Sequence, residues 1–188
     1  LPDLLKFSKK HEIKIGTIAD LIEYRSKKEK LIKRISEEKV NTEFGMMKLI
    51  VYSDLLSKNT HLAFVKGDIK KDDEVVVRVH EPLSILDFVS KETPHSWPPL
   101  KALKKISNEK NGVVIFLNYN ESQNNITSKL NHENIALRKS TDLRSYGIGS
   151  QILVDIGVSK MKLLAAPRKM PSMAGYGLQV TEFIVNDT

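Results

Sequence analysis

The sequence contains no cysteine among its 188 residues. That absence excludes disulfide bonds, cysteine nucleophiles and every zinc site that depends on thiolate ligands. No apolar run reaches the length of about 18 residues that a transmembrane helix needs, and the opening stretch LPDLLKFSKK lacks the apolar core of a signal peptide. We therefore expect a cytoplasmic protein that makes no contact with a membrane.

Aromatic residues are scarce, at 6% of the chain, and they do not alternate with basic residues. A stacking platform for single-stranded nucleic acid is therefore missing, and we expect no nucleic-acid partner. The formal net charge of +7 suits a smaller anion such as a nucleotide or a phosphate. Much of the excess lies in the run RSKKEKLIKR, residues 25–34, whose helical spacing favours a solvated helix or linker face.

The first half of the chain predicts two helices followed by strands. Apolar residues recur at helical spacing over about residues 1–30, and Thr17 is placed to cap the stretch IADLIEYRSKKEKL. Between residues 35 and 81 the period shortens towards two, and MMKLIVYS, HLAFVKG and EVVVRVHE are rich in β-branched and aromatic residues. Short polar turns separate these stretches, so we predict three or more neighbouring strands with antiparallel pairing.

The second half predicts alternating helices and strands. Residues 97–110 favour a helix, and GVVIFL from Gly112 is a continuous apolar run typical of a strand buried on both faces. The asparagine-rich stretch at 118–132 has little periodicity and predicts a long, mobile loop. The later elements are expected at 149–156 (helix), 161–164 (strand) and 178–184 (strand). The predicted fold class is α+β to α/β, with a β-rich first half and a layered α/β second half.

Several stretches, in order along nearly the whole chain, resemble one family. LPDLLKFSKKHEIKIGTIADLIEYR is similar to the C-terminal end of 3,4-dihydroxy-2-butanone 4-phosphate synthase, where bifunctional riboflavin-biosynthesis proteins continue into a GTP cyclohydrolase II domain. TEFG, HLAFVKGD, VVVRVH, GVVIFL, DLRSYGIGSQILVDIGV and GYGLQV resemble that second domain. The resemblance implies a synthase end plus linker at 1–34 and a GTP cyclohydrolase II-like domain at 35–188. Because the chain does not begin with Met, we expect it to be a piece of a longer protein.

The family's reaction, as the resemblance implies, opens the imidazole ring of GTP and releases formate and pyrophosphate. Its zinc ion is held by three cysteines and activates the attacking water. Counted on from the RVH stretch, the three cysteine positions fall on Leu83, Pro94 and Ser96, none of which is a thiolate donor. We therefore expect the family's zinc to be absent and no other cofactor to replace it.

Two histidines leave an alternative open at this point. His80 and His95, together with Asp87 or Glu92, would be a chemically acceptable metal-ligand set. The plainer interpretation is that His80 lies at a strand end and that His95 lies on the surface.

Other family features have changed as well. The glycine-rich loop that would follow GVVIFL reads NYNESQNNI, which lacks the glycines that let backbone N–H groups approach a phosphate. The family's catalytic tyrosine has no counterpart between Tyr119 and Tyr146, and its Thr-Asn-Asn-Pro turn reads Leu-Ala-Ala-Pro at 164–167.

Four charged residues match family site positions. Asp142 and Arg144 match the proton acceptor and the nucleophile, and Arg78 and Lys169 match substrate-binding positions. Without an activated water, an acid and an arginine have no hydrolytic step to perform. We therefore interpret Asp142 and Arg144 as silent remnants, with Asp142 capping a turn and Arg144 in a salt bridge.

Three functions follow from these observations. The first is a non-catalytic GTP cyclohydrolase II-like domain that supports assembly, stability or regulation of an upstream synthase, in a chain expected to form a homodimer. The second is an active GTP cyclohydrolase II with a rearranged metal site. The third is a module that senses a nucleotide or phosphate with Arg78, Arg144, Arg168 and Lys169.

Overall fold

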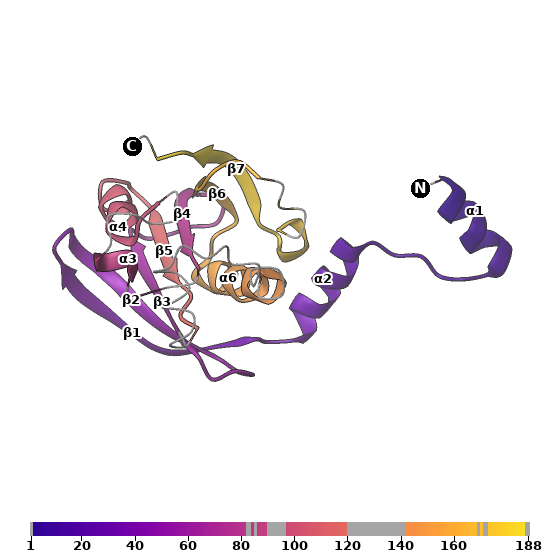
Figure 1. Cartoon of the computed structure of the whole chain (residues 1–188), viewed down its shortest axis with the longest axis horizontal. Helices are drawn as coiled ribbons and strands as arrows, with labels where there is room; N and C mark the ends of the chain where they lie inside the picture. Colours follow the sequence, from indigo (N-terminus) through magenta and orange to yellow (C-terminus); the bar gives the residue numbers. More distant parts are fainter. Residues whose placement is uncertain are drawn as a thin grey trace.

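A computed structural model describes residues 2–81, 84, 86–89, 97–119, 142–168, 170 and 173–186. The chain starts with two helices, α1 (Pro2–His11) and α2 (Ile18–Lys28), and α1 stands away from the rest of the molecule on an extended segment (Figure 1). Thr17 caps α2 as predicted: its Oγ1 accepts from the Asp20 N–H at 3.0 Å, and its own N–H donates to the Asp20 carboxylate at 2.9 Å. This capping box satisfies backbone donors at the exposed helix start.

Three antiparallel strands follow, β1 (Ile32–Thr42), β2 (Gly45–Asp54) and β3 (Thr60–Lys66). The last two confirm the strands predicted from MMKLIVYS and HLAFVKG. The interpretation of 25–34 as a helix or linker face holds only in part, because α2 ends at Lys28 and residues 32–34 already belong to β1. Backbone pairing with β2, which begins at Ile32↔Asp54, extends the strand into the charged run.

The strand predicted from EVVVRVHE is β4 (Glu74–His80), but the antiparallel pairing expected for it is wrong. β5 (Gly112–Phe116) lies between β3 and β4, and β4 runs parallel to both β5 and β6 (Lys160–Leu164). The helices α3 (Leu86–Val89) and α4 (Pro99–Ser107) belong to the connection from β4 to β5, which is long enough for a parallel crossover. The all-apolar β5, buried along its whole length, takes the central place in the sheet.

The remaining elements confirm the layered second half. They are α6 (Asp142–Ile156), β6, the 3₁₀ turn η2 (Ala174–Tyr176) and β7 (Gln179–Ile184). The helix expected over 149–156 begins two turns earlier, at Asp142. Of the loop predicted at 118–132, Asn118 and Tyr119 alone are described, and the rest lies outside the described residues.

The seven strands form one mixed sheet in the order β1-β2-β3-β5-β4-β6-β7, with helices on both faces (Figure 1). On one face, Ile148, Ile152 and Leu153 of α6 pack against alternate residues of β2 to β6. On the other face, Ala102, Leu103 and Ile106 of α4 pack with Trp97. This arrangement confirms the predicted fold class and places the start of α6 near the carboxyl ends of the parallel strands.

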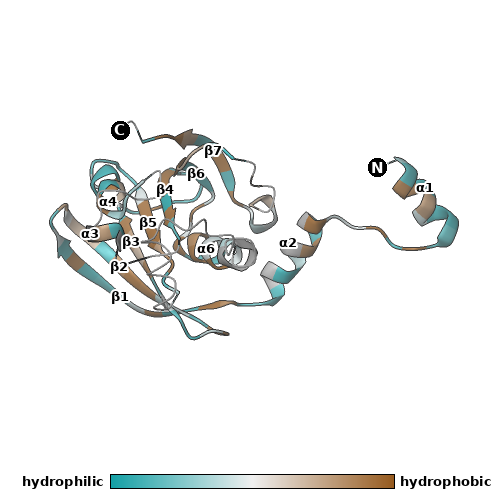
Figure 2. Cartoon of the chain, viewed as in Figure 1, coloured by the Kyte–Doolittle hydropathy of each residue, from teal (hydrophilic) through white to brown (hydrophobic). Residues whose placement is uncertain are grey.

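The N-terminal helices carry apolar side chains that the rest of the chain does not cover. Leu4, Phe7, Ile18 and Leu21 are all more than half exposed, and Figure 2 shows brown segments on α1 and α2. Among the described residues, no helix is both long and apolar enough to cross a membrane.

Candidate functional site

Several side chains that could form a site, Arg78 of the predicted residues among them, lie at the carboxyl ends of the parallel strands. Arg78 and His80 lie at the carboxyl end of β4, Arg168 follows β6, and Tyr146 lies in the second turn of α6. In open α/β sheets, ligands bind outside this edge. Gly149 lets α6 lie close to the sheet here, because a Cβ at that position would be 3.3 Å from Cγ1 of Val79.

Arg78 is a buried cation with few partners. Its side chain is 7% exposed, and one guanidinium nitrogen donates to the carbonyl oxygen of Leu164 at 2.9 Å. Its Nε has no hydrogen-bond partner among the described residues. Burial, followed by the nearby charge of Arg168, lowers the pKa of Arg78 to about 10, while Asp87 acts in the opposite direction. The guanidinium therefore remains protonated at neutral pH, and it favours an added negative charge.

Arg168 stands over the aromatic face of Tyr146, with its guanidinium carbon 5.4 Å from the ring centroid. Such a contact attracts a cation to the ring without neutralising its charge. Two positive charges, on Arg78 and Arg168, thus lie near one another at the strand ends. This arrangement can hold an anion.

His80 is at the end of β4, as the plainer sequence interpretation predicted, and it is fully buried. Its Nε2 lies 2.8 Å from Oδ2 of Asp87, and the Ser84 N–H donates to the same oxygen at 2.8 Å. The carboxylate therefore fixes the orientation of the imidazole ring. This pair accounts for the Asp87 side chain through local structure and ties the segment after β4 to the strand end.

The predicted catalytic pair lies on the first turn of α6. Asp142 is the first residue of the helix and Arg144 the third, whereas the placements of their side chains lie outside what the structure describes. Lys169 and His95 also fall outside the described residues, as do Leu83, Pro94 and Ser96 at the positions of the family's cysteines. Of the four predicted site residues, Arg78 is therefore the one whose side-chain contacts are defined.

The side chains that the structure describes offer no set of ligands for the family's zinc ion. The sequence has no thiolate donor. Within the described ranges, no three histidine, aspartate or glutamate side chains come together as a metal-binding group. At this edge, His80 and Asp87 are joined by a direct hydrogen bond.

One buried histidine near the same strand ends has no role in the sequence interpretation. His61 of β3 is fully buried, its Nδ1 accepts from the Asn118 N–H at 3.2 Å, and the ring of Tyr119 stands edge-on at 5.4 Å. Accepting at Nδ1 places the proton of the neutral ring on Nε2. The strand's alternating pattern indicates that His61 faces inward, but the sequence gives no sign of its partners.

Comparison with known proteins agrees with the fold and the motifs. The family model described as GTP cyclohydrolase II matches residues 33–185. A 3,4-dihydroxy-2-butanone 4-phosphate synthase of Neisseria meningitidis serogroup B is 42% identical over 183 residues, which are 97% of this chain and 50% of the relative. The riboflavin biosynthesis protein RibBA of Aquifex aeolicus is 37% identical over 197 residues, 97% of this chain and 48% of the relative.

A solved structure is similar over the same extent. The crystal structure of RibBX, a two-domain 3,4-dihydroxy-2-butanone 4-phosphate synthase from A. baumannii, superposes with a TM-score of 0.63 at 33% identity, covering 98% of this chain and 49% of that one. The chain thus spans about half the length of the relatives it matches. The match over 33–185 and the shared fold show that the chain belongs to the GTP cyclohydrolase II family.

Proposed function

We propose that this chain is a GTP cyclohydrolase II-family domain of a riboflavin-biosynthesis protein that no longer performs the cyclohydrolase reaction. The observation that carries the proposal is the absence of any cysteine, because the family's zinc needs three thiolates. The hydrogen bond between His80 and Asp87 adds support, since it engages the imidazole at the carboxyl end of β4. Asp142 and Arg144 are then remnants without an activated water.

In this proposal, the remaining function of the domain is to support an upstream 3,4-dihydroxy-2-butanone 4-phosphate synthase. Residues 1–34 are the end of that synthase plus a linker in this proposal, and residues 35–188 are the supporting domain. Relatives of about twice the length bear the synthase name, and the exposed apolar residues of α1 need a covering surface. We expect the whole protein to be a cytoplasmic homodimer.

The test compares the full-length protein with a truncation that ends before residue 35. Synthase rate, thermal unfolding temperature and molar mass in solution are measured for both. We expect the truncated protein to lose stability or assembly, with a lower synthase activity as the consequence. Equal rates, stability and mass for the two proteins would contradict a supporting role.

A second candidate is anion sensing, and the buried Arg78 favours it. Among the described residues, the buried guanidinium makes one hydrogen bond, and the charge of Arg168 acts on it more strongly than the opposite charge of Asp87, so an added anion would stabilise it. Titration calorimetry with pyrophosphate and with GTP, repeated on Arg78→Met, tests this function. Binding that disappears in the variant supports sensing, and the absence of heat with both ligands contradicts it.

A further inference from the structure

One face of α6 contacts the segment by which the chain enters the domain. Gly147, Gln151 and Asp155 are spaced four residues apart, so they lie on the same side of the helix. Each of them contacts a part of residues 29–34, which we call the strap; it consists of the connection from α2 to β1 and the first three residues of β1. Asp142 and Arg144 belong to the first turn of the same helix.

Gln151 binds the strap through its backbone. Its Nε2 donates to the carbonyl oxygen of Glu29 at 2.8 Å, and its Oε1 accepts from the N–H of Leu31 at 2.8 Å. A single amide thus satisfies two backbone groups, one on each side of Lys30, that would otherwise need water as their hydrogen-bond partner. Because both contacts are to the backbone, they cannot be predicted from the side chains of the strap.

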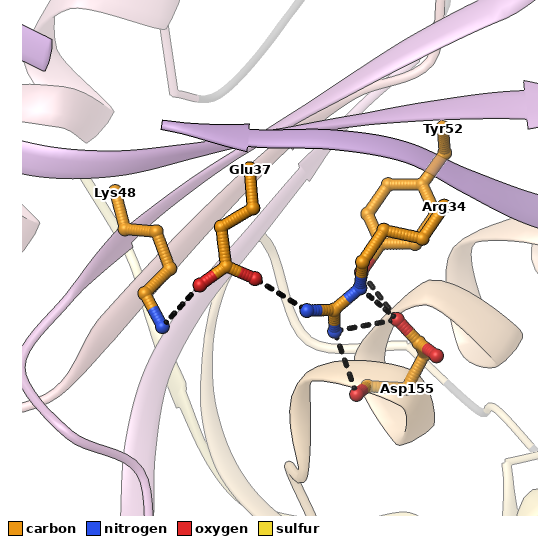
Figure 3. A network of polar contacts seen from close by, with 5 residues as sticks. All are labelled: Arg34, Glu37, Lys48, Tyr52 and Asp155. Carbon is orange, nitrogen blue, oxygen red and sulfur yellow. Dashed lines mark hydrogen bonds and ion pairs between the residues drawn. The ribbon is translucent and has the colours of Figure 1, made fainter. Parts of the chain in front are cut away.

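Asp155 binds the strap one turn further along. Its Oδ2 accepts from Nη2 of Arg34 at 2.7 Å and from Nε at 3.0 Å, and its carbonyl oxygen accepts from Nη2 at 3.1 Å. The Tyr52 hydroxyl donates to the same carboxylate oxygen at 2.6 Å. Figure 3 shows Arg34 pointing from β1 to Asp155 on α6 across the ring of Tyr52.

Gly147 has no side chain, and this leaves space for Leu31 of the strap. A Cβ at this position would lie 3.1 Å from the hydroxyl of Tyr176 and 3.4 Å from Cδ1 of Leu31. Tyr176 belongs to η2, against which α2 packs, and the charges of Arg25 and Glu29 both act on its hydroxyl. The end of α2 and the strap therefore rest on α6 and η2 together.

We propose that this face of α6 is a docking surface for the strap and that it fixes α2, and the unit that precedes α2, at a set position on the domain. Without these contacts, a strap with so many lysine and arginine residues would act as an extended, flexible linker. Held at residues 29, 31 and 34 by Gln151 and Asp155, it instead transmits the orientation of the upstream unit to α6. The identity of that unit as a synthase rests on the proposed function, whereas the docking itself does not.

Distance measurements between two spin labels test the docking on this chain alone. Since the protein has no cysteine, the pair Leu21→Cys on α2 and Lys101→Cys on α4 can be labelled without further changes, and both side chains are exposed. We expect a single narrow distance distribution. In Gln151→Ala the width should at least double, and Gln151→Glu, which keeps the acceptor for Leu31 but loses the donor to Glu29, should fall between the two.

Val154→Ala is the matched control, because Val154 is an exposed neighbour on the same helix, and its distribution should match that of the parent. A distribution that is already broad in the parent, or one that Gln151→Ala leaves unchanged, overturns the proposal. Circular dichroism and thermal unfolding show whether each variant is folded, and Arg34→Ala, which detaches the strap from Asp155 without changing α6, replaces Gln151→Ala if the latter unfolds. The readout involves no synthase activity, so its outcome and that of the truncation test are independent.

Discussion

The hydrogen bond between Tyr52 and Asp155 allows a prediction of stability in numbers. Tyr52 is fully buried in β2, and its hydroxyl donates at 2.6 Å to a carboxylate whose side chain is 42% exposed. Burial raises the pKa of Tyr52, so the hydroxyl stays a donor at neutral pH. A hydrogen bond to a charged group contributes about 1.5–3 kcal/mol, and the exposure of Asp155 favours the lower end.

The ion pair of Arg34 with the same carboxylate contributes less. The two side chains are 37% and 42% exposed, so the pair is worth about 0.5 kcal/mol. The guanidinium also stands 5.8 Å from the Tyr52 ring centroid, which adds about 0.5 kcal/mol. The expected losses in the free energy of unfolding are therefore about 1.5 kcal/mol for Tyr52→Phe, about 1 for Arg34→Ala and about 2 for Asp155→Ala.

Urea unfolding of the three variants and of Tyr52→Phe/Asp155→Ala is the assay. The double variant should lose little more than Asp155→Ala alone, because the hydroxyl has already lost its acceptor, and the resulting coupling should be about 1.5 kcal/mol. Two results would refute the reasoning. One is additive losses in the double variant, and the other is a larger loss for Arg34→Ala than for Asp155→Ala.

Three further predictions concern other parts of the molecule. Replacing the buried cation in Arg78→Met should leave the protein as stable or stabilise it by about 1 kcal/mol, as measured by urea unfolding; a loss above about 2 kcal/mol would instead make the guanidinium structural. Gly67→Ala should destabilise the protein by about 2 kcal/mol or more, because Gly67 has φ +81° and a Cβ there would collide with the backbone oxygen of Lys110. The thermal unfolding temperature of this variant should fall. Gly16→Ala is the control, because the space around Gly16 is open. Stability should also fall on acidification. Hydrogen-bond donors lower the pKa of several glutamate carboxyl groups from the ordinary value of 4.5, so around and below that value the folded state binds fewer protons than the unfolded state. The urea midpoint should therefore decline as the pH falls through 4.5 and then through the lowered pKa values. The groups concerned are Glu29, Glu37 and Glu74. A midpoint that stays constant down to about pH 3 would contradict this prediction.

Local signals predicted the elements well where they were strong. Thr17 followed by Asp20 specifies a capping box, and GVVIFL specifies a buried strand, and both are present. Local signals do not predict the position of β4 in the strand order of the sheet. Its short connection to β3 suggests a hairpin, yet β5 enters between the two strands, and that choice depends on how the whole apolar surface is buried.

The candidate site shows the same limit. The family resemblance makes Arg78 a candidate, but its burial and its closeness to Arg168 depend on the packing of β4, β6 and the following turn. The strap is less visible still. Gln151 and Asp155 lie more than a hundred residues from the backbone and side-chain groups they bind, and the charged run that contains Arg34 reads as a solvated surface.

The proposed loss of cyclohydrolase activity is tested most directly by one measurement on the purified protein. GTP turnover is followed by release of formate, with and without added Zn²⁺, Mg²⁺ or Mn²⁺, and the metal content is determined in the same sample. A family member that has its three cysteines serves as the positive control. We predict no turnover under any of these conditions and no stoichiometric zinc. Zinc at one ion per chain together with formate release would contradict the proposal and would mean that other side chains have rebuilt the metal site.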